Sequence, residues 1–291
     1  YQEVSQQRIK ISKEELTKHT FITGSTGSGK SNTICKLLET LNNQGIKFLV
    51  IEPAKGEYKA LFGNRENVCV YGTNPNLRNC AMLRMNPFRF PRSVHVLEHL
   101  DRLVEIFNVC WPMYAAMPAI LKDAMEKAYI AAGWDLALSR NRFDENLYPS
   151  FVDVFKQIKK VLDESDYSAD NKGDYTGALV TRVKSLTNGL NGLIFTTDDL
   201  EDRELFEQNI IVDLSRVGSA DTKALIMGIL VLKLQEYRMD TGESNSCLKH
   251  ITVLEEAHNL LKRTSTEQSA ESSNLLGKSV ELLANSIAEI R

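Results

Sequence analysis

The chain of 291 residues carries a formal net charge of -3, and its composition is 43% hydrophobic and 25% charged. This length and composition suit one large core or two modest domains of a soluble protein, and the acidic balance excludes a globally basic nucleic-acid binder. The five cysteines stand without close pairs, which favours neither a zinc site nor a disulfide framework and indicates a reducing cytoplasm. No apolar run approaches the ~20 residues that span a membrane, and no signal peptide opens the chain.

The first strong pattern in chain order is TFITGSTGSGKSN, at residues 20–32. A short apolar segment, residues 20–23, is predicted as a strand that leads into a glycine-rich loop and then into a helix beginning near Lys30. This order satisfies the phosphate-loop pattern of nucleoside triphosphatases. Glycines let backbone N–H groups turn toward a phosphate, and the positive end of the helix dipole adds to the attraction. The predicted nucleotide-binding residues are Ser25, Thr26, Gly27, Ser28, Gly29, Lys30, Ser31 and Asn32.

Two residues of this loop have separate predicted roles. Lys30 is placed for the β- and γ-phosphates of ATP, where its charge serves catalysis, and Ser31 is placed for a magnesium ion. ATP and Mg²⁺ are therefore the expected cofactors.

Apolar runs then predict further strands at residues 46–52, 68–71, 210–214 and 251–254. The helix after the glycine-rich loop is predicted to stop near Gly45, and the next strand ends at Glu52. Continuous apolar strands joined by helices are typical of a buried, mostly parallel sheet in an α/β fold. Because ligands gather at the carboxyl ends of such strands, Glu52 and the phosphate loop are expected at one edge of the sheet.

A long stretch, residues 93–205, is mostly helical in pattern and is predicted as a helical subdomain inserted into the sheet. The ATPase core then comprises residues 19–92 and 206–291. Within the stretch, residues 151–162 place apolar side chains at helical spacing. Residues 163–177 are turn-rich and are predicted as an exposed connection.

The segment ITVLEEAH, residues 251–258, ends an apolar strand with Glu255 and Glu256. Adjacent carboxylates raise the cost of ionising each other, which a nearby cation offsets. Glu255 is therefore assigned to magnesium, and Glu256 is assigned as the catalytic carboxylate that orients the attacking water. The alternative is two solvated glutamates at the start of a helix.

Four segments together carry a family resemblance: HTFITGSTGSGKSN, VIEPAKGEY, IVDLSRVGS and ITVLEEAHNLL. They resemble the HerA family, in the HerA/FtsK branch of phosphate-loop motors with a RecA/FtsK-like sheet, and the resemblance extends from about residue 16 to residue 291. The phosphate loop alone would indicate only a nucleoside triphosphatase, whereas the other segments are more specific. One departure is Glu255, where the family usually has aspartate.

The resemblance implies a homo-hexameric, ATP-driven translocase or helicase acting on double-stranded DNA. It also implies a nuclease or sirtuin-like effector as a partner, in DNA-end processing or anti-phage defence. Residues 1–18 would be a linker or the end of an N-terminal barrel, and the family sheet continues past residue 291 into a strand with a nucleotide sensor. Arg291 would be a catalytic arginine finger for the neighbouring subunit, and the alternative is an ordinary solvated chain end.

Two questions stay open at the level of sequence. Lys55 and Lys59 suit either a ring pore or an ordinary surface. The alternative to a DNA motor is a nucleotide-gated ring scaffold, which assembles and activates an effector without moving DNA.

Overall fold

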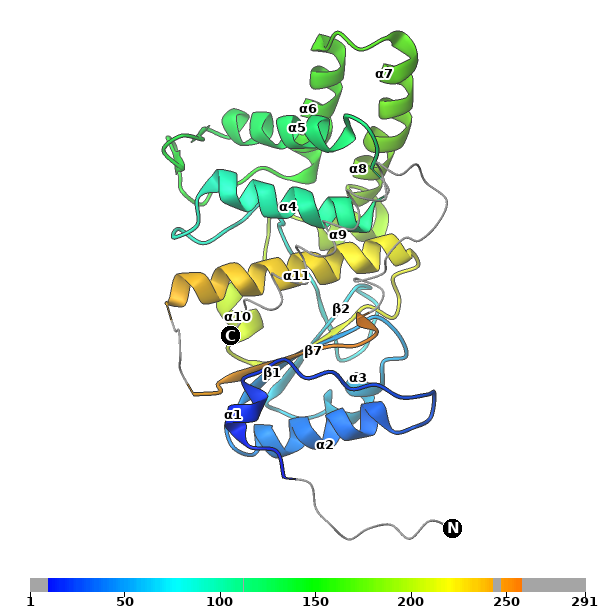
Figure 1. Ribbon diagram of the computed structural model, residues 1–291, viewed down its shortest axis with the longest axis vertical. Helices are drawn as coiled ribbons and strands as arrows, with labels where there is room; N and C mark the ends of the chain where they lie inside the picture. The colour runs from blue at the N-terminus through cyan, green and yellow to red at the C-terminus, as the bar shows by residue number, and fades with distance from the viewer. Residues whose placement is uncertain (1–9, 112, 243–246, 258–291) are drawn as a thin grey trace.

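The computed structural model describes residues 10–111, 113–242 and 247–257, and it shows an α/β fold built on a five-stranded parallel sheet (Figure 1). The strand order across the sheet is β3-β2-β6-β1-β7. The strands are β1 (Lys47–Glu52), β2 (Val68–Gly72), β3 (Ala81–Met82), β6 (Asn209–Asp213) and β7 (His250–Leu254). Apolar runs predicted all of them except β3, whose two residues are too few to form a pattern.

Side chains along each strand alternate between the two faces of the sheet. On β1, Phe48 and Val50 pack into one hydrophobic cluster, while Leu49 and Ile51 pack into a second cluster on the opposite face. Both faces are thus covered, which explains why the strands appear in the sequence as continuous apolar runs.

Helices α2 (Lys30–Asn42) and α3 (Glu57–Phe62) cover one face of the sheet, below it in Figure 1, with the short α1 (Lys13–Leu16) beside them. The face of α2 that packs on the sheet carries Cys35, Leu38 and Leu41. The predicted helix is confirmed, and so is its end, because Gly45 adopts the left-handed conformation with φ 80°.

The opposite face is covered by α10 (Asp202–Phe206) and α11 (Ala220–Thr241). Helix α11 is buried on nearly every side over residues 224–236, because it lies between the sheet and the helices beyond it. Its sequence lacks one polar face, so helical periodicity did not reveal it. In the described part of the chain, no helix has the length and apolar character needed to cross a membrane.

Further helices lie beyond α11, at the top of Figure 1, and α4 packs directly on α11. They are α4 (Val96–Cys110), α5 (Met117–Ala131), α6 (Phe151–Glu164), α7 (Ala169–Tyr175), α8 (Thr181–Leu186) and α9 (Gly189–Ile194), with a small hairpin of β4 (Trp134–Asp135) and β5 (Arg140–Asn141). Their apolar side chains share one hydrophobic cluster with the sheet through α11. The division of the chain into a core and an inserted subdomain stays a prediction.

The structure differs from the sequence prediction in two segments. Residues 20–23 form no strand: Phe21 is 85% exposed, and within the described residues this segment pairs with no strand of the sheet. Residues 163–177 are largely helical: Ser168 caps α7, and a π-helical turn (Thr176–Val180) follows. The ring of Tyr175 is buried against Tyr114 and Tyr167, a tertiary contact that stabilises this helix.

Candidate functional site

The phosphate loop adopts a conformation that requires its glycines. Gly27 and Gly29 have φ of 78° and 95°, in the left-handed region that side chains with a Cβ rarely adopt. At Gly24, a Cβ would lie 2.4 Å from Ser28 Oγ, so that position also needs glycine. Residues 25–28 are exposed and lead directly into the N-terminus of α2, an arrangement that binds anions.

Lys30 lies over this loop as the first residue of α2. Its Nζ donates hydrogen bonds to the carbonyl oxygens of Gly24, at 2.8 Å, and Ser25, at 3.1 Å. The ammonium group is thus held within the loop where a phosphate chain would bind. Ser31 follows in the first turn and is partly exposed, and Asn32 is exposed.

Three carboxylates end three adjacent strands: Glu52 on β1, Asp213 on β6, and Glu255 directly after β7. Glu52 and Asp213 are register partners, and the N–H of Glu255 donates to the carbonyl oxygen of Ile51 at 3.1 Å. Strand alternation directs all three side chains to the face that α2 and α3 cover. In Figure 1 the loop entering α2 and the carboxyl end of β7 lie on the same side of the molecule.

Glu52 holds the first turn of α3. Its Oε1 accepts from the N–H of Glu57 at 2.6 Å, and its Oε2 accepts from the N–H of Tyr58 at 3.2 Å. The pKa of Glu52 is raised to about 7, mainly by burial and also by the carboxylates of Asp213 and Glu57, although the two N–H groups lower it. Glu52 therefore serves as the N-terminal anchor of α3.

Asp213 and Lys59 form an ion pair at 3.6 Å, and the side chain of Lys59 is only 24% exposed. Lys59 thus contacts the carboxylate cluster. Lys55 differs, since its side chain is 62% exposed and pairs with Glu57 at 3.6 Å. Its φ of 69° places it in the left-handed region, in the turn between β1 and α3.

Glu255 accepts a hydrogen bond at Oε1 from the hydroxyl of Tyr58, which α3 carries. Tyr58 is 1% exposed, and burial, followed by the hydrogen bond to Glu255, raises its pKa well above the ordinary value, so the hydroxyl remains a donor. The sequence analysis missed both Tyr58 and Asp213. Asp213 could have been found from the sequence, because it too ends an apolar strand. No local sequence pattern, by contrast, indicates that Tyr58 contacts Glu255.

Cys35 connects the carboxylates to α2. Burial, together with the carboxylates of Glu57, Glu255 and Glu52, raises the pKa of its thiol to about 11. Tyr58, which donates to Glu255, packs in the same hydrophobic cluster as Cys35. Ser31 stands four residues earlier on α2, so it shares the helix face that carries Cys35. The tertiary structure thus brings Glu255 to the side of α2 that carries Ser31.

The other predicted residues have different outcomes. Glu256 is exposed and lies in the turn after β7, with φ 50°, so its role in orienting water stays a prediction. Arg291 lies outside the described residues. In the described part of the chain no three His, Cys, Asp or Glu side chains form a metal-binding group. The side-chain oxygens of Ser31 and Glu255 would nevertheless suit magnesium, because this ion is usually held by one or two protein oxygens together with phosphates and water.

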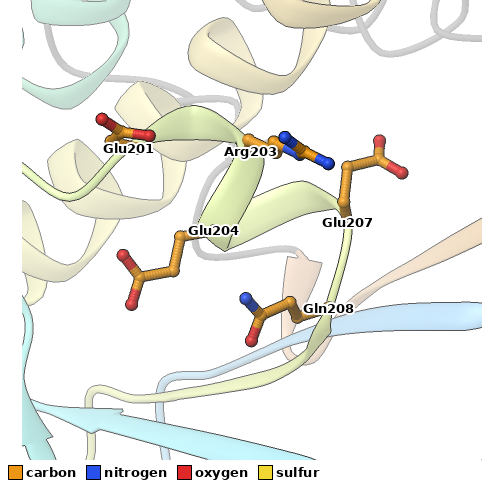
Figure 2. A pocket seen from close by; sticks show the side chains of 5 residues that line it. All are labelled: Glu201, Arg203, Glu204, Glu207 and Gln208. Carbon is orange, nitrogen blue, oxygen red and sulfur yellow. The ribbon is translucent and has the colours of Figure 1, made fainter.

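A surface cavity of about 380 Å³ lies elsewhere, around α10 (Figure 2). It is lined by Glu201, Arg203, Glu204, Glu207 and Gln208. Its carboxylates already have partners, since Tyr71 donates to Glu204 and Arg238 donates to Glu207. Because most of its charges are negative, this cavity repels phosphate, and the glycine-rich loop is the better nucleotide site.

Comparisons with known proteins agree with this geometry. The profile of the family described as "Helicase HerA, central domain" matches residues 2–234. No curated protein matches the chain in sequence. Among solved structures, VirB4 of Thermoanaerobacter pseudethanolicus is similar, with a TM-score of 0.58 and 18% sequence identity. The match covers 90% of this chain and 66% of that chain, so it shows a shared fold over a part of the VirB4 chain.

Proposed function

The chain belongs to the HerA central-domain family of phosphate-loop ATPases, and from this membership we propose that it is an ATP-hydrolysing translocase or helicase for double-stranded DNA. We propose a ring of six subunits as its working form. The observation that supports the nucleotide site is the contact network of Glu255. Its carboxylate accepts from Tyr58, and Tyr58 packs in the same hydrophobic cluster as Cys35, on the face of α2 that also carries Ser31.

The residues divide the work of hydrolysis. Backbone N–H groups of the loop bind the phosphates, and Lys30 moves from the loop carbonyls to the β- and γ-phosphates. Ser31 and Glu255 hold the magnesium ion, which neutralises charge on the phosphate oxygens when bound. Glu256 orients a water molecule and accepts its proton as the oxygen attacks the γ-phosphorus, and ADP leaves with the electrons of the broken P–O bond. Arg291 of a neighbouring subunit stabilises the charge on the transferred group.

The proposed partners are double-stranded DNA and a nuclease or sirtuin-like effector, in DNA-end processing or anti-phage defence. The cytoplasm is the proposed location, because five cysteines without close pairs suit a reducing compartment. A basic patch for DNA must be local, since the net charge is -3.

The test measures ATP turnover with and without double-stranded DNA, together with displacement of a third strand from a triplex. A motor gives DNA-stimulated turnover and displacement in one direction. ATP-dependent assembly with an effector, without displacement, would replace the motor by the nucleotide-gated scaffold. Absence of ATP turnover in the assembled ring would overturn both the motor and the catalytic assignments.

A further inference from the structure

We propose that Tyr58 is a positioning residue for the magnesium site, because its hydroxyl fixes the carboxylate of Glu255 beside the phosphate loop. The inference rests on the proposed function and adds a role for α3, the helix that carries Tyr58. The two partners are 197 residues apart in the chain and meet only through the parallel pairing of β1 with β7.

The ring of Tyr58 has a fixed place from which its hydroxyl can act. It lies in the hydrophobic cluster that also contains Cys35 and Leu38 of α2, with 1% of the residue exposed. The backbone of Tyr58 is held too, because its N–H donates to Glu52 Oε2 at 3.2 Å. The backbone of Tyr58 is therefore fixed in α3, and its ring is fixed by the packed cluster.

Glu255 needs such an anchor because the strand has ended and the backbone turns at the next residue. It is the first residue after β7, and Glu256 then turns with φ 50°. A glutamate has three side-chain torsions, so without a partner its carboxylate would occupy several rotamers. The hydroxyl of Tyr58 binds Oε1, and in the described residues no other hydrogen bond to this carboxylate competes for Oε2. Oε2 is the oxygen that we assign to the metal.

The chain of contacts is continuous from one strand end to the next. Glu52 at the end of β1 fixes the first turn of α3, α3 places the hydroxyl of Tyr58, and the hydroxyl orients Glu255 after β7. Residues that orient a metal ligand in this way typically contribute 10- to 100-fold to metal affinity or activity. Tyr58 itself contacts neither metal nor nucleotide, so it acts only through Glu255.

The test is the Tyr58→Phe protein, which keeps the buried ring and removes only the hydroxyl. Tyr71→Phe is the matched control, because Tyr71 is also buried and also donates to a glutamate, Glu204, but at the acidic cavity. The measurement is the apparent Mg²⁺ dissociation constant of each protein with a non-hydrolysable ATP analogue, by titration calorimetry. We expect at least ~10-fold weaker Mg²⁺ binding for Tyr58→Phe and no change for Tyr71→Phe.

Turnover provides a second readout that a merely structural role would not move. If Tyr58 acts through the metal site, the Tyr58→Phe protein recovers most of its kcat at high Mg²⁺ concentration, while the KM for ATP at saturating metal stays at the wild-type value. A kcat that stays low at every Mg²⁺ concentration would overturn the inference.

A double-mutant comparison guards against a folding defect. Glu255→Asp shortens the side chain and withdraws the carboxylate from the hydroxyl, so it should weaken Mg²⁺ binding by itself. Adding Tyr58→Phe to Glu255→Asp should then weaken the binding no further, because the two changes remove one contact. Additive losses would show that Tyr58 acts elsewhere. A wild-type protein that binds Mg²⁺ and the analogue but hydrolyses no ATP would refute the proposed function alone, whereas equal Mg²⁺ affinity in wild type and Tyr58→Phe would refute this inference alone.

Discussion

The Nδ1 atom of His99 lies 3.0 Å from both carboxylate oxygens of Glu236, and both side chains are fully buried. The other ring nitrogen, Nε2, lies 3.0 Å from the carbonyl oxygen of Pro87. The carbonyl oxygen of Pro87 can only accept, so Nε2 donates to it, and Nδ1 pairs with the carboxyl group of Glu236. The pair joins α4 to α11 and thereby fastens the helical segment to the helix that covers the sheet.

Breaking this pair should destabilise the protein strongly. Glu236→Ala leaves the buried Nδ1 of His99 without its partner. It also removes one of two carboxylate partners of Arg102, whose Nη1 lies 3.5 Å from Glu236 Oε1. We expect the free energy of unfolding, measured by urea denaturation, to fall by about 3–5 kcal/mol. The control is Asp101→Ala, which removes an exposed pair with Lys122 and should cost less than about 1 kcal/mol. Similar losses of unfolding free energy in the two variants would show that His99 and Glu236 do not form a strongly stabilising buried pair.

Lys30→Ala should abolish ATP turnover, because it removes the cation that the loop holds at the phosphate position. We expect a loss on the order of 100-fold or more in kcat/KM, with weaker nucleotide binding by calorimetry. Lys36→Ala is the control on the same helix, since Lys36 is 79% exposed and pairs only with Glu39 in the described residues. A Lys30→Ala protein with wild-type turnover would move the nucleotide site away from the glycine-rich loop.

Glu256→Gln should separate binding from hydrolysis. The amide keeps the shape of the side chain but cannot accept a proton from water, so ATP stays bound while turnover falls by about 10²–10⁴-fold. Single-turnover kinetics and nucleotide binding measure the two effects. Glu57→Gln, which changes a nearby carboxylate that pairs with Lys55, should leave hydrolysis near the wild-type rate. If the two variants behave alike, Glu256 is the solvated glutamate of the alternative interpretation.

Glu52 should make stability depend on pH. Its folded-state pKa is raised from 4.5 to about 7, mainly by burial, so the folded protein holds this proton more tightly than the unfolded chain. The resulting stability is complete below pH 4.5 and is lost as the pH rises to about 7. We expect Glu52→Gln to lack this fall in the free energy of unfolding, measured by urea denaturation at pH 5 and pH 8. An identical fall in wild type and variant would assign the effect to other groups.

Arg291 can be tested by mixing subunits. An Arg291→Ala subunit should bind ATP with its own phosphate loop but hydrolyse it slowly, since the arginine from its neighbour is missing. A Lys30→Ala subunit has an inactive site and an intact Arg291, so it can complete the site of an Arg291→Ala neighbour. We expect the mixture to hydrolyse ATP faster than either parent. Mass measurement must show that the two kinds of subunit co-assemble. If such mixtures recover no ATP turnover, Arg291 is an ordinary chain end.

The local features of this protein could be predicted from the sequence because neighbouring residues specify them. The glycines at 27 and 29 are required by left-handed φ angles within the loop itself. The apolar runs of β1 and β6 are continuous because both faces of these strands are buried. Strand β7, at the edge of the sheet, is partly buried. Ser168, which caps α7, is also a local signal, but the prediction of an exposed connection over residues 163–177 did not use it.

The tertiary structure alone decided which of these features meet. Strand order places β6 between β2 and β1, and β7 beside β1, and no local pattern encodes that order. The contact of Tyr58 with Glu255 follows from this order, as does the cluster of carboxylates at one sheet edge. Residues 20–23 show that a local pattern alone does not decide whether a strand forms. Their apolar composition favours a strand, yet a strand requires backbone hydrogen bonds to a neighbour, and within the described residues this segment pairs with no strand.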